Sequence, residues 1–146
     1  DEHPGTWEAL RADPAAIPAT IEEVLRLRPP FPFAGRATTR DVEIAGTTVP
    51  ARSIVLPWML SANHDPAAHA DPERFDPTRH GIGGGAQLAF GHGIHFCLGA
   101  PLARLEARVA LEEMTARYPA LSVAAGEQDP YTRSVLGTRH LPLVAT

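Results

Sequence analysis

The chain has 146 residues and a formal net charge of −4, with 13 Lys and Arg residues against 17 Asp and Glu. A net negative chain without a basic stripe excludes nucleic acid as a partner, and no apolar run approaches the ~20 residues that span a bilayer. The single cysteine, Cys97, excludes an internal disulfide and predicts a cytoplasmic protein.

Apolar spacing and chain-breaking residues predict two short helices at the start of the chain, over residues 5–12 and 18–28. Pro29-Pro30 ends the second helix. From residue 37 to residue 60, alternating apolar and polar residues around a central turn predict a β region. Repeated Asp-Pro pairs then predict a long meander loop over residues 61–89.

The longest predicted helix covers residues 101–118, with Pro101 in its first turn. Leu98, Leu102, Leu105 and Val109 recur at helical spacing and predict one apolar stripe along it. Short strands within residues 121–146 complete an α+β fold, mainly α with short β-hairpins.

Residues 90–99 read Phe-Gly-His-Gly-Ile-His-Phe-Cys-Leu-Gly and precede the long helix. A thiol in a glycine-rich loop is typical of a metal ligand or a nucleophile. His92, His95 and Cys97 allow a three-ligand zinc site, although a structural zinc site needs a fourth ligand. A cysteine nucleophile activated by histidine is the other reading, and it needs an orienting Asn or Asp.

This segment resembles the haem-binding loop of the cytochrome P-450 family in its soluble bacterial form, F-x-x-G-x-x-x-C-x-G, and residues 100–108 continue the likeness. The resemblance implies haem b (iron protoporphyrin IX), with Cys97 as its iron ligand and catalytic residue. Phe90, Gly91 and Gly99 then belong to the cofactor-binding loop. His95 and Arg36 are the residues expected to contact the haem propionates.

Glu23 and Arg26 also match the E-x-x-R helix of that family, and Pro72-Glu73-Arg74-Phe75 resembles its downstream arginine segment. The resemblance implies a buried charge triad of Glu23, Arg26 and Arg74. By the same analogy, two short stretches face an apolar substrate: Phe33 and Ala34, and Val135 and Leu136. Arg104 and Arg108 lie one turn apart and are the expected docking patch for an electron donor.

The family likeness implies a monooxygenase that oxidises an apolar small molecule with O2 and electrons from a ferredoxin or flavoprotein. It extends over residues 1–146 as one C-terminal segment, an incomplete, truncated form of the family fold, since no A-G-x-[DE]-T-like sequence occurs. The alternative is a non-catalytic haem-binding or interaction module that needs a partner chain. An exposed apolar face, and self-association through it, is expected in either case.

Overall fold

The computed structural model describes residues 3–79, 87–124, 130–132, 135–138 and 140–146. Its α-helices are α1 (Thr6–Ala12), α2 (Ile17–Leu27), α3 (Met59–Asn63) and α4 (Ala100–Arg117). Single 3-10 turns lie at Pro14–Ala16, Pro77–Arg79 and Gly93–His95. The strands are β1 (Arg36–Ala37), β2 (Val42–Ile44), β3 (Thr47–Val49), β4 (Ile54–Val55), β5 (Leu121–Val123), β6 (Pro130–Thr132), β7 (Val135–Thr138) and β8 (Leu143–Ala145).

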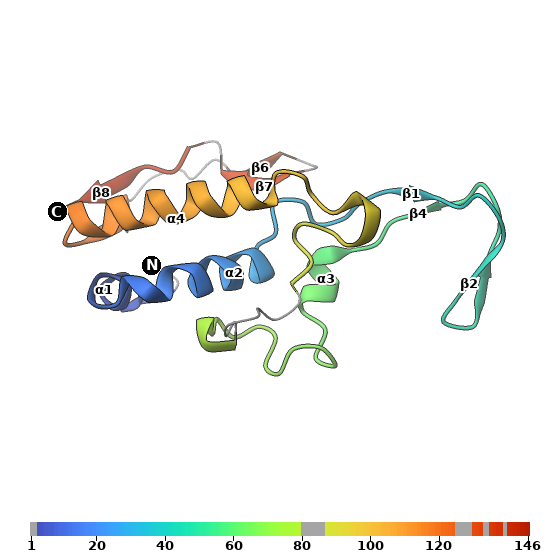
Figure 1. Ribbon diagram of the computed structural model, residues 1–146, viewed down its shortest axis with the longest axis horizontal. Coiled ribbons are helices and arrows are strands. Elements are labelled where there is room, and N and C mark those ends of the chain that lie inside the picture. Colours follow the sequence, from blue (N-terminus) through green and yellow to red (C-terminus); the bar gives the residue numbers. More distant parts are fainter. Residues whose placement is uncertain (1–2, 80–86, 125–129, 133–134, 139) are drawn as a thin grey trace.

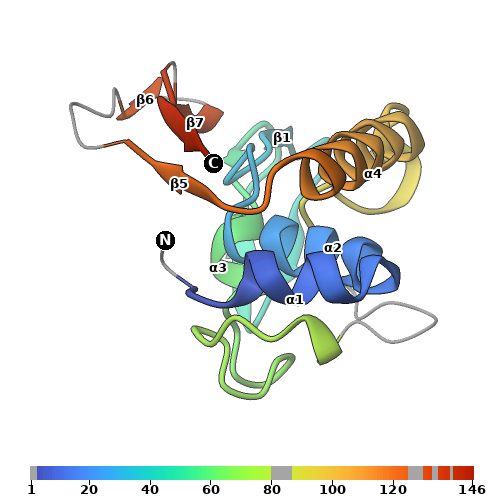
Figure 2. The same cartoon turned by 90° about the vertical axis from the view of Figure 1, so that its left-hand side faces the viewer.

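The described apolar core is small and lies where α1, α2 and α4 meet (Figures 1 and 2). Pro18 occupies the first turn of α2, where its missing N–H leaves no helical hydrogen bond unmade. One apolar side of α2 turns toward α1 and α4. The buried members of this core and the α4 residues packed on it are Leu10, Ile17, Ile21, Ala107 and Leu111.

Only part of the predicted apolar stripe of α4 faces this core, since Leu105 lines the same pocket as the core residue Ile21. Leu102 is 58% exposed and Val109 is 45% exposed, whereas Ala107 and Leu111 pack on α2. At 100° per residue the two sets lie on opposite sides of the helix, so one side holds α2 and the other presents Leu102 and Val109 to solvent. An exposed apolar face is therefore present among the described residues, as expected from the sequence.

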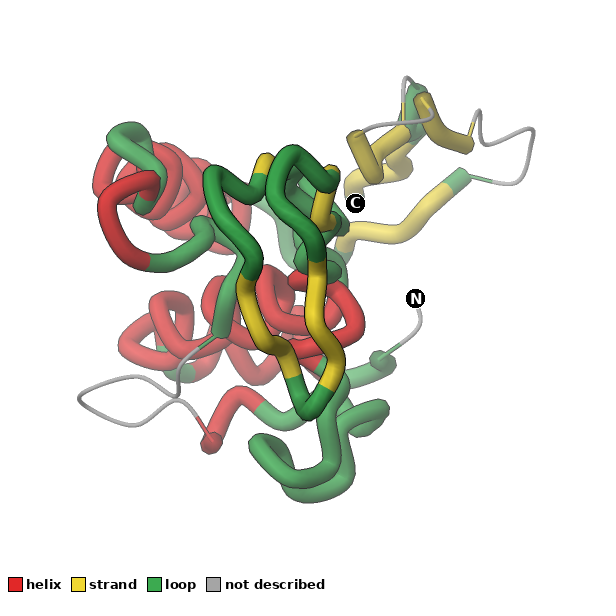
Figure 3. The backbone as a smooth tube through the Cα atoms, turned by 90° about the vertical axis from the view of Figure 1, so that its right-hand side faces the viewer, coloured by secondary structure: helices red, strands yellow, loops and turns green. Residues whose placement is uncertain are grey.

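The strands form antiparallel pairs of two: β1 with β4, β2 with β3, β5 with β8, and β6 with β7. Ala45 and Gly46 join β2 to β3, and both have positive φ, 48° and 77°. This is the pattern of a type I′ turn, which matches the twist of a tight hairpin. The β2–β3 hairpin projects from the helical part of the molecule (Figures 1 and 3).

The N-terminal helix closes the far end of α4. The Trp7 indole N–H donates to the Tyr118 carbonyl at 3.1 Å, and the Arg11 guanidinium donates to the same oxygen at 2.9 Å and to the Thr115 carbonyl. These carbonyls belong to the last turn of α4, whose acceptors have no partner within the helix. α1 thus caps the C-terminal end of α4 with a cation.

The predicted class, α+β with mainly helices and short hairpins, is confirmed. The helices expected over 18–28 and 101–118 correspond to α2 and α4. No apolar periodicity predicts α3, which lies across the boundary between the β region and the meander expected at residue 60. Burial of Met59 and Asn63 stabilises this short helix. Residues 80–86 of the expected meander lie outside the described residues. No helix in the described parts of the chain combines the length and apolarity needed to cross a bilayer.

Candidate functional site

Helix α2 carries a buried ion pair between two of its own side chains. Glu23 and Arg26 lie one turn apart, both side chains are 0% exposed, and Arg26 Nε lies 2.8 Å from Glu23 Oε2. Arg26 Nη2 donates to the second carboxylate oxygen at 2.9 Å. The remaining Arg26 N–H groups donate to the carbonyls of Asn63, Pro72 and Arg74 at 2.7–3.2 Å. All five donors of the guanidinium are used, so Arg26 ties α2 to α3 and to the meander.

The prediction that Arg74 is the third buried charge of this cluster is wrong. Its guanidinium side chain is 67% exposed and lies 3.7 Å from Asp76, and only its backbone carbonyl reaches Arg26. Arg79 takes the position instead, with Nε 3.1 Å from Glu23 Oε1. The reason is geometric: the Asp76 N–H also donates to Glu23 at 2.9 Å, which turns the chain so that the 3-10 turn Pro77–Arg79 faces α2.

A second buried residue connects this cluster to the cysteine loop. Asn63 is 0% exposed, its carbonyl accepts from Arg26, and its Oδ1 accepts the Leu88 N–H at 2.7 Å. Leu88 in turn accepts the Gly91 N–H at 2.8 Å. The likeness to the family implies a loop-anchoring role for Asn63 and His64, and the hydrogen bond from Leu88 to Asn63 joins positions 25 residues apart.

The loop that carries Cys97 is closed by its own backbone. The Cys97 N–H donates to the Phe90 carbonyl at 2.9 Å, and the Phe96 N–H donates to the Gly93 carbonyl at 3.0 Å. Gly91 and Gly93 have φ values of 72° and 75°, a left-handed backbone that glycine adopts without a steric penalty. A Cβ at Gly99 would lie 3.8 Å from the Cys97 sulfur, so this glycine borders the thiol directly.

The Cys97 thiol is exposed, and so are the apolar side chains around it. Ile94 and Leu98 are each 98% exposed and Phe96 is 50% exposed. Apolar side chains in this number around one thiol fit a large apolar group better than water. Within the described residues, no three His, Cys, Asp or Glu side chains converge to hold a metal ion, so the three-ligand zinc site is not formed. The donor set therefore fits haem, whose macrocycle supplies the other iron ligands and needs one thiolate from the protein.

The two residues expected at the haem propionates lie in separate segments. His95 is exposed and ends the 3-10 turn Gly93–His95. Arg36 is exposed in β1, where its Nη1 donates to the neighbouring Gly35 carbonyl at 2.8 Å. Both groups are accessible to an anionic partner.

The segments that carry the two stretches expected to face substrate are linked by a backbone hydrogen bond. The Leu136 N–H donates to the Pro30 carbonyl at 2.6 Å, which docks β7 on the segment that leads to Phe33 and Ala34. The Phe33 ring lies 5.0 Å from the Trp58 ring, and the Ala34 N–H donates to the Pro57 carbonyl at 3.1 Å. β7 thus meets the chain at Pro30, three residues before Phe33, although the two segments are about a hundred residues apart in the sequence.

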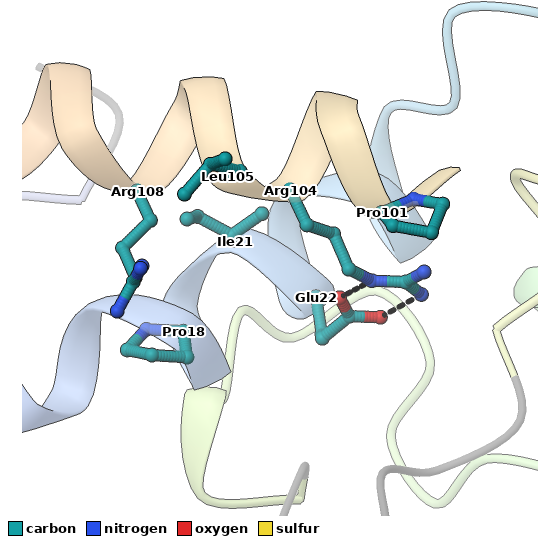
Figure 4. Close-up of a pocket in the computed structure, with 7 residues that line it drawn as sticks. All are labelled: Pro18, Ile21, Glu22, Pro101, Arg104, Leu105 and Arg108. Carbon is teal, nitrogen blue, oxygen red and sulfur yellow. Dashed lines mark hydrogen bonds and ion pairs between the residues drawn. The ribbon is translucent and has the colours of Figure 1, made fainter. Parts of the chain in front are cut away.

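Arg104 and Arg108, the predicted patch on α4, lie in two different environments. Arg104 is half-buried and forms a two-pronged ion pair with Glu22, in which Nη2 lies 2.9 Å from Oε2 (Figure 4). The hydrogen bond to the Glu22 carboxylate raises the pKa of the Arg104 guanidinium above its usual value. Arg108, one turn later, is more exposed and lies 3.9 Å from Glu112. The sequence offered no signal for Glu22 as a partner, because 82 positions separate it from Arg104.

Comparison with known proteins gives consistent matches. The family model described as cytochrome P450 matches residues 12–142. Erythromycin C-12 hydroxylase of Saccharopolyspora erythraea is 58% identical over 147 residues, which cover 99% of this chain and 37% of that protein. Cyclomarin C epoxidase of Salinispora arenicola is 44% identical, over 97% of this chain and 35% of that protein. Among solved structures, the open cytochrome P450 EryK of S. erythraea superposes with a TM-score of 0.92 at 57% identity, over 99% of this chain and 37% of that one.

Proposed function

The chain belongs to the cytochrome P450 family, and from that premise we propose that it is the haem-binding portion of a monooxygenase in which Cys97 binds the iron. Its fold is a partial P450 fold, since the chain spans 37% of the length of its relative erythromycin C-12 hydroxylase. The observation that carries the proposal is the Cys97 loop itself. It is closed by backbone hydrogen bonds, bordered by Gly99 and surrounded by exposed apolar side chains.

The residues of the loop have distinct parts in this proposal. Cys97 supplies a thiolate, and Gly91 and Gly99 keep side chains away from the face that the cofactor would occupy. The Phe90 carbonyl accepts the Cys97 N–H and so fixes the base of the loop. His95 and Arg36 are the proposed partners of the propionates, because a guanidinium and an imidazole both donate hydrogen bonds to carboxylates.

Haem b, when bound, supplies the oxidation chemistry, and a thiolate ligand favours cleavage of the O–O bond. The protein's contribution is to orient the cofactor and to exclude water from it. Phe33, Ala34, Val135 and Leu136 are the proposed contacts of an apolar small molecule, supported by the docking of β7 on the Pro30 segment.

The electron donor in this proposal is a ferredoxin or flavoprotein. Of the two arginines first assigned to its docking patch, Arg108 has the more exposed side chain, 47% against 38% for Arg104. The donor patch is therefore proposed at Arg108. A cytoplasmic location stays a prediction from the single cysteine. Self-association through the exposed apolar face of α4 also stays a prediction.

The alternative, a non-catalytic haem-binding module, has no support among these observations, because the similar proteins are named as a hydroxylase and an epoxidase. Those names state the activity of the relatives, and a hydroxylation or epoxidation by this protein is part of the proposal.

The test is an anaerobic titration with haem, followed by reduction and addition of carbon monoxide, observed by absorbance. We expect the strongly red-shifted Soret band of a carbonyl opposite a thiolate. Cys97→Ala should abolish this band. The matched control His92→Ala alters a histidine of the same loop and should retain it. A band in Cys97→Ala that equals the unaltered protein would refute Cys97 as the ligand.

A further inference from the structure

The ion pair between Glu22 and Arg104 joins α2 to α4, the helix that follows the Cys97 loop. Arg104 extends from α4 down to α2, where its forked guanidinium meets both oxygens of Glu22 beside Pro101 (Figure 4). Glu22 is adjacent to Glu23 in sequence, so successive carboxylates of α2 serve different neighbours. One binds the buried Arg26, and the other binds α4.

Arg104 also lies against the base of the loop. Its guanidinium carbon is 4.5 Å from the centre of the Phe90 ring, a distance at which a cation is attracted to an aromatic face. The Phe90 carbonyl accepts the Cys97 N–H at 2.9 Å. Two contacts therefore separate Arg104 from the backbone of Cys97.

Gln87 links the same Glu22 carboxylate to the segment that leads into the loop. Its Nε2 donates to Glu22 Oε2 at 3.0 Å, and its Oε1 accepts the Ala89 N–H at 2.6 Å. Glu22 thus binds residues on both sides of the loop, Gln87 before it and Arg104 after it. We refer to Glu22, Gln87, Phe90 and Arg104 as the loop clamp.

We propose that Glu22 and Arg104 are positioning residues that fix the Phe90–Cys97 loop, and through it the direction in which the Cys97 sulfur points. This inference rests on the proposed function only for the role of the sulfur, because the clamp itself is a property of the protein. It assigns to Arg104 a different part from donor docking, since the charge that a donor would meet is already paired with Glu22.

The chemistry of the clamp requires arginine and a carboxylate. A planar guanidinium can bind two carboxylate oxygens and cover an aromatic ring at once, and the single ammonium of lysine cannot do both. Arg104→Lys should therefore loosen the loop although the charge is kept. Glu22→Gln keeps the size of the side chain and removes the charge, so it tests the same clamp from the other helix.

The first measurement needs no haem: hydrogen exchange at the Cys97 amide, with the Ile21 amide of α2 as an internal reference for global stability. Arg104→Lys and Glu22→Gln should each speed exchange at Cys97 by about fivefold relative to the reference. The double variant should be no faster than the quicker single variant. Arg108→Gln, the matched control on the next turn of α4, should leave the Cys97 rate unchanged.

The second measurement uses the same variants loaded with haem, reduced and bound to carbon monoxide. It records the share of the carbonyl complex that shows the thiolate band. Arg104→Lys and Glu22→Gln should lower this share, and Arg108→Gln should not. An unchanged Cys97 exchange rate in both clamp variants would overturn the inference. So would an unchanged thiolate share together with weaker electron-donor binding in Arg104→Lys, which would return Arg104 to a docking patch.

The two measurements separate this inference from the proposed function. A faster Cys97 amide in the clamp variants, with no thiolate band even in the unaltered protein, would retain the clamp and refute the function proposed for the sulfur. A thiolate band in every variant with unchanged exchange would retain the function and refute the clamp.

Discussion

Replacement of Arg26 by methionine removes the cation at the centre of the molecule and leaves a side chain of similar length. Glu23 would keep two of its partners, Arg79 Nε at 3.1 Å and the Asp76 N–H at 2.9 Å. We therefore take the lower end of the usual range for a buried ion pair that loses one partner, about 3 kcal/mol. The Asn63 carbonyl, which faces Arg26 in a fully buried residue, adds about 1 kcal/mol.

The expected loss is thus about 4 kcal/mol, a large share of the 5–15 kcal/mol that stabilises a typical domain. Urea unfolding followed by far-UV circular dichroism measures it as a lower midpoint at unchanged slope. Arg117→Met is the matched control, because its partner Glu113 is exposed and the pair is worth only about 0.5 kcal/mol.

The double variant Glu23→Met/Arg26→Met extends the test. It removes both charges, so it should lose less free energy of unfolding than the two single variants added together. A loss below about 1 kcal/mol in Arg26→Met, the size of a surface ion pair, would refute the reasoning. Strict additivity in the double variant would refute it as well.

Three further changes test other contacts of the fold. Asn63→Leu leaves the Leu88 N–H without its acceptor, so we expect a loss of about 2 kcal/mol and faster hydrogen exchange at the Leu88 amide. Arg11→Met removes the cation at the end of α4 and should cost about 1 kcal/mol, visible as faster exchange in its last turn. The Thr78 hydroxyl, by its hydrogen bond, lowers the pKa of Asp76 below its usual 3.8, and Arg74 and Arg79 act in the same direction. Ionised Asp76 therefore stabilises the fold above about pH 4, and this stabilisation is lost as pH falls through the lowered pKa. Thr78→Val should raise that pKa toward 3.8 in an NMR titration, and an unmoved value would contradict this cause.

The helices could be predicted because their signals are local. Pro18 and Pro29-Pro30 lie at the two ends of α2, and Pro101 lies in the first turn of α4. These prolines therefore predict the ends of both helices to within a residue or two. The Cys97 loop was equally visible, since Gly91 and Gly93 lie at positions where the backbone has positive φ.

The contacts that join distant segments could not be predicted from the sequence. Arg74 and Arg79 are five residues apart, and only the folded meander decides which of them reaches Glu23. Glu22 and Arg104 are 82 positions apart and neither has a local pattern that names the other. The apolar residues of α4 do recur along one side of the helix, as predicted. Whether that side faces the core or the solvent depends on which side of α4 packs on α2.

The polar centre of the molecule has a consequence for its response to temperature. Among the residues that the structure describes, the largest fully buried side chains are Arg26, Ile17, Glu23, Asn63 and Pro29, so charged and amide groups occupy the place that aliphatic groups hold in most domains. Exposure of apolar surface raises the heat capacity on unfolding, and exposure of polar surface lowers it. Calorimetry should therefore give a heat-capacity change below the usual 12–15 cal/mol/K per residue, on the order of 10. The free energy of unfolding would then vary little with temperature, and the protein would resist cold better than a domain with an aliphatic centre.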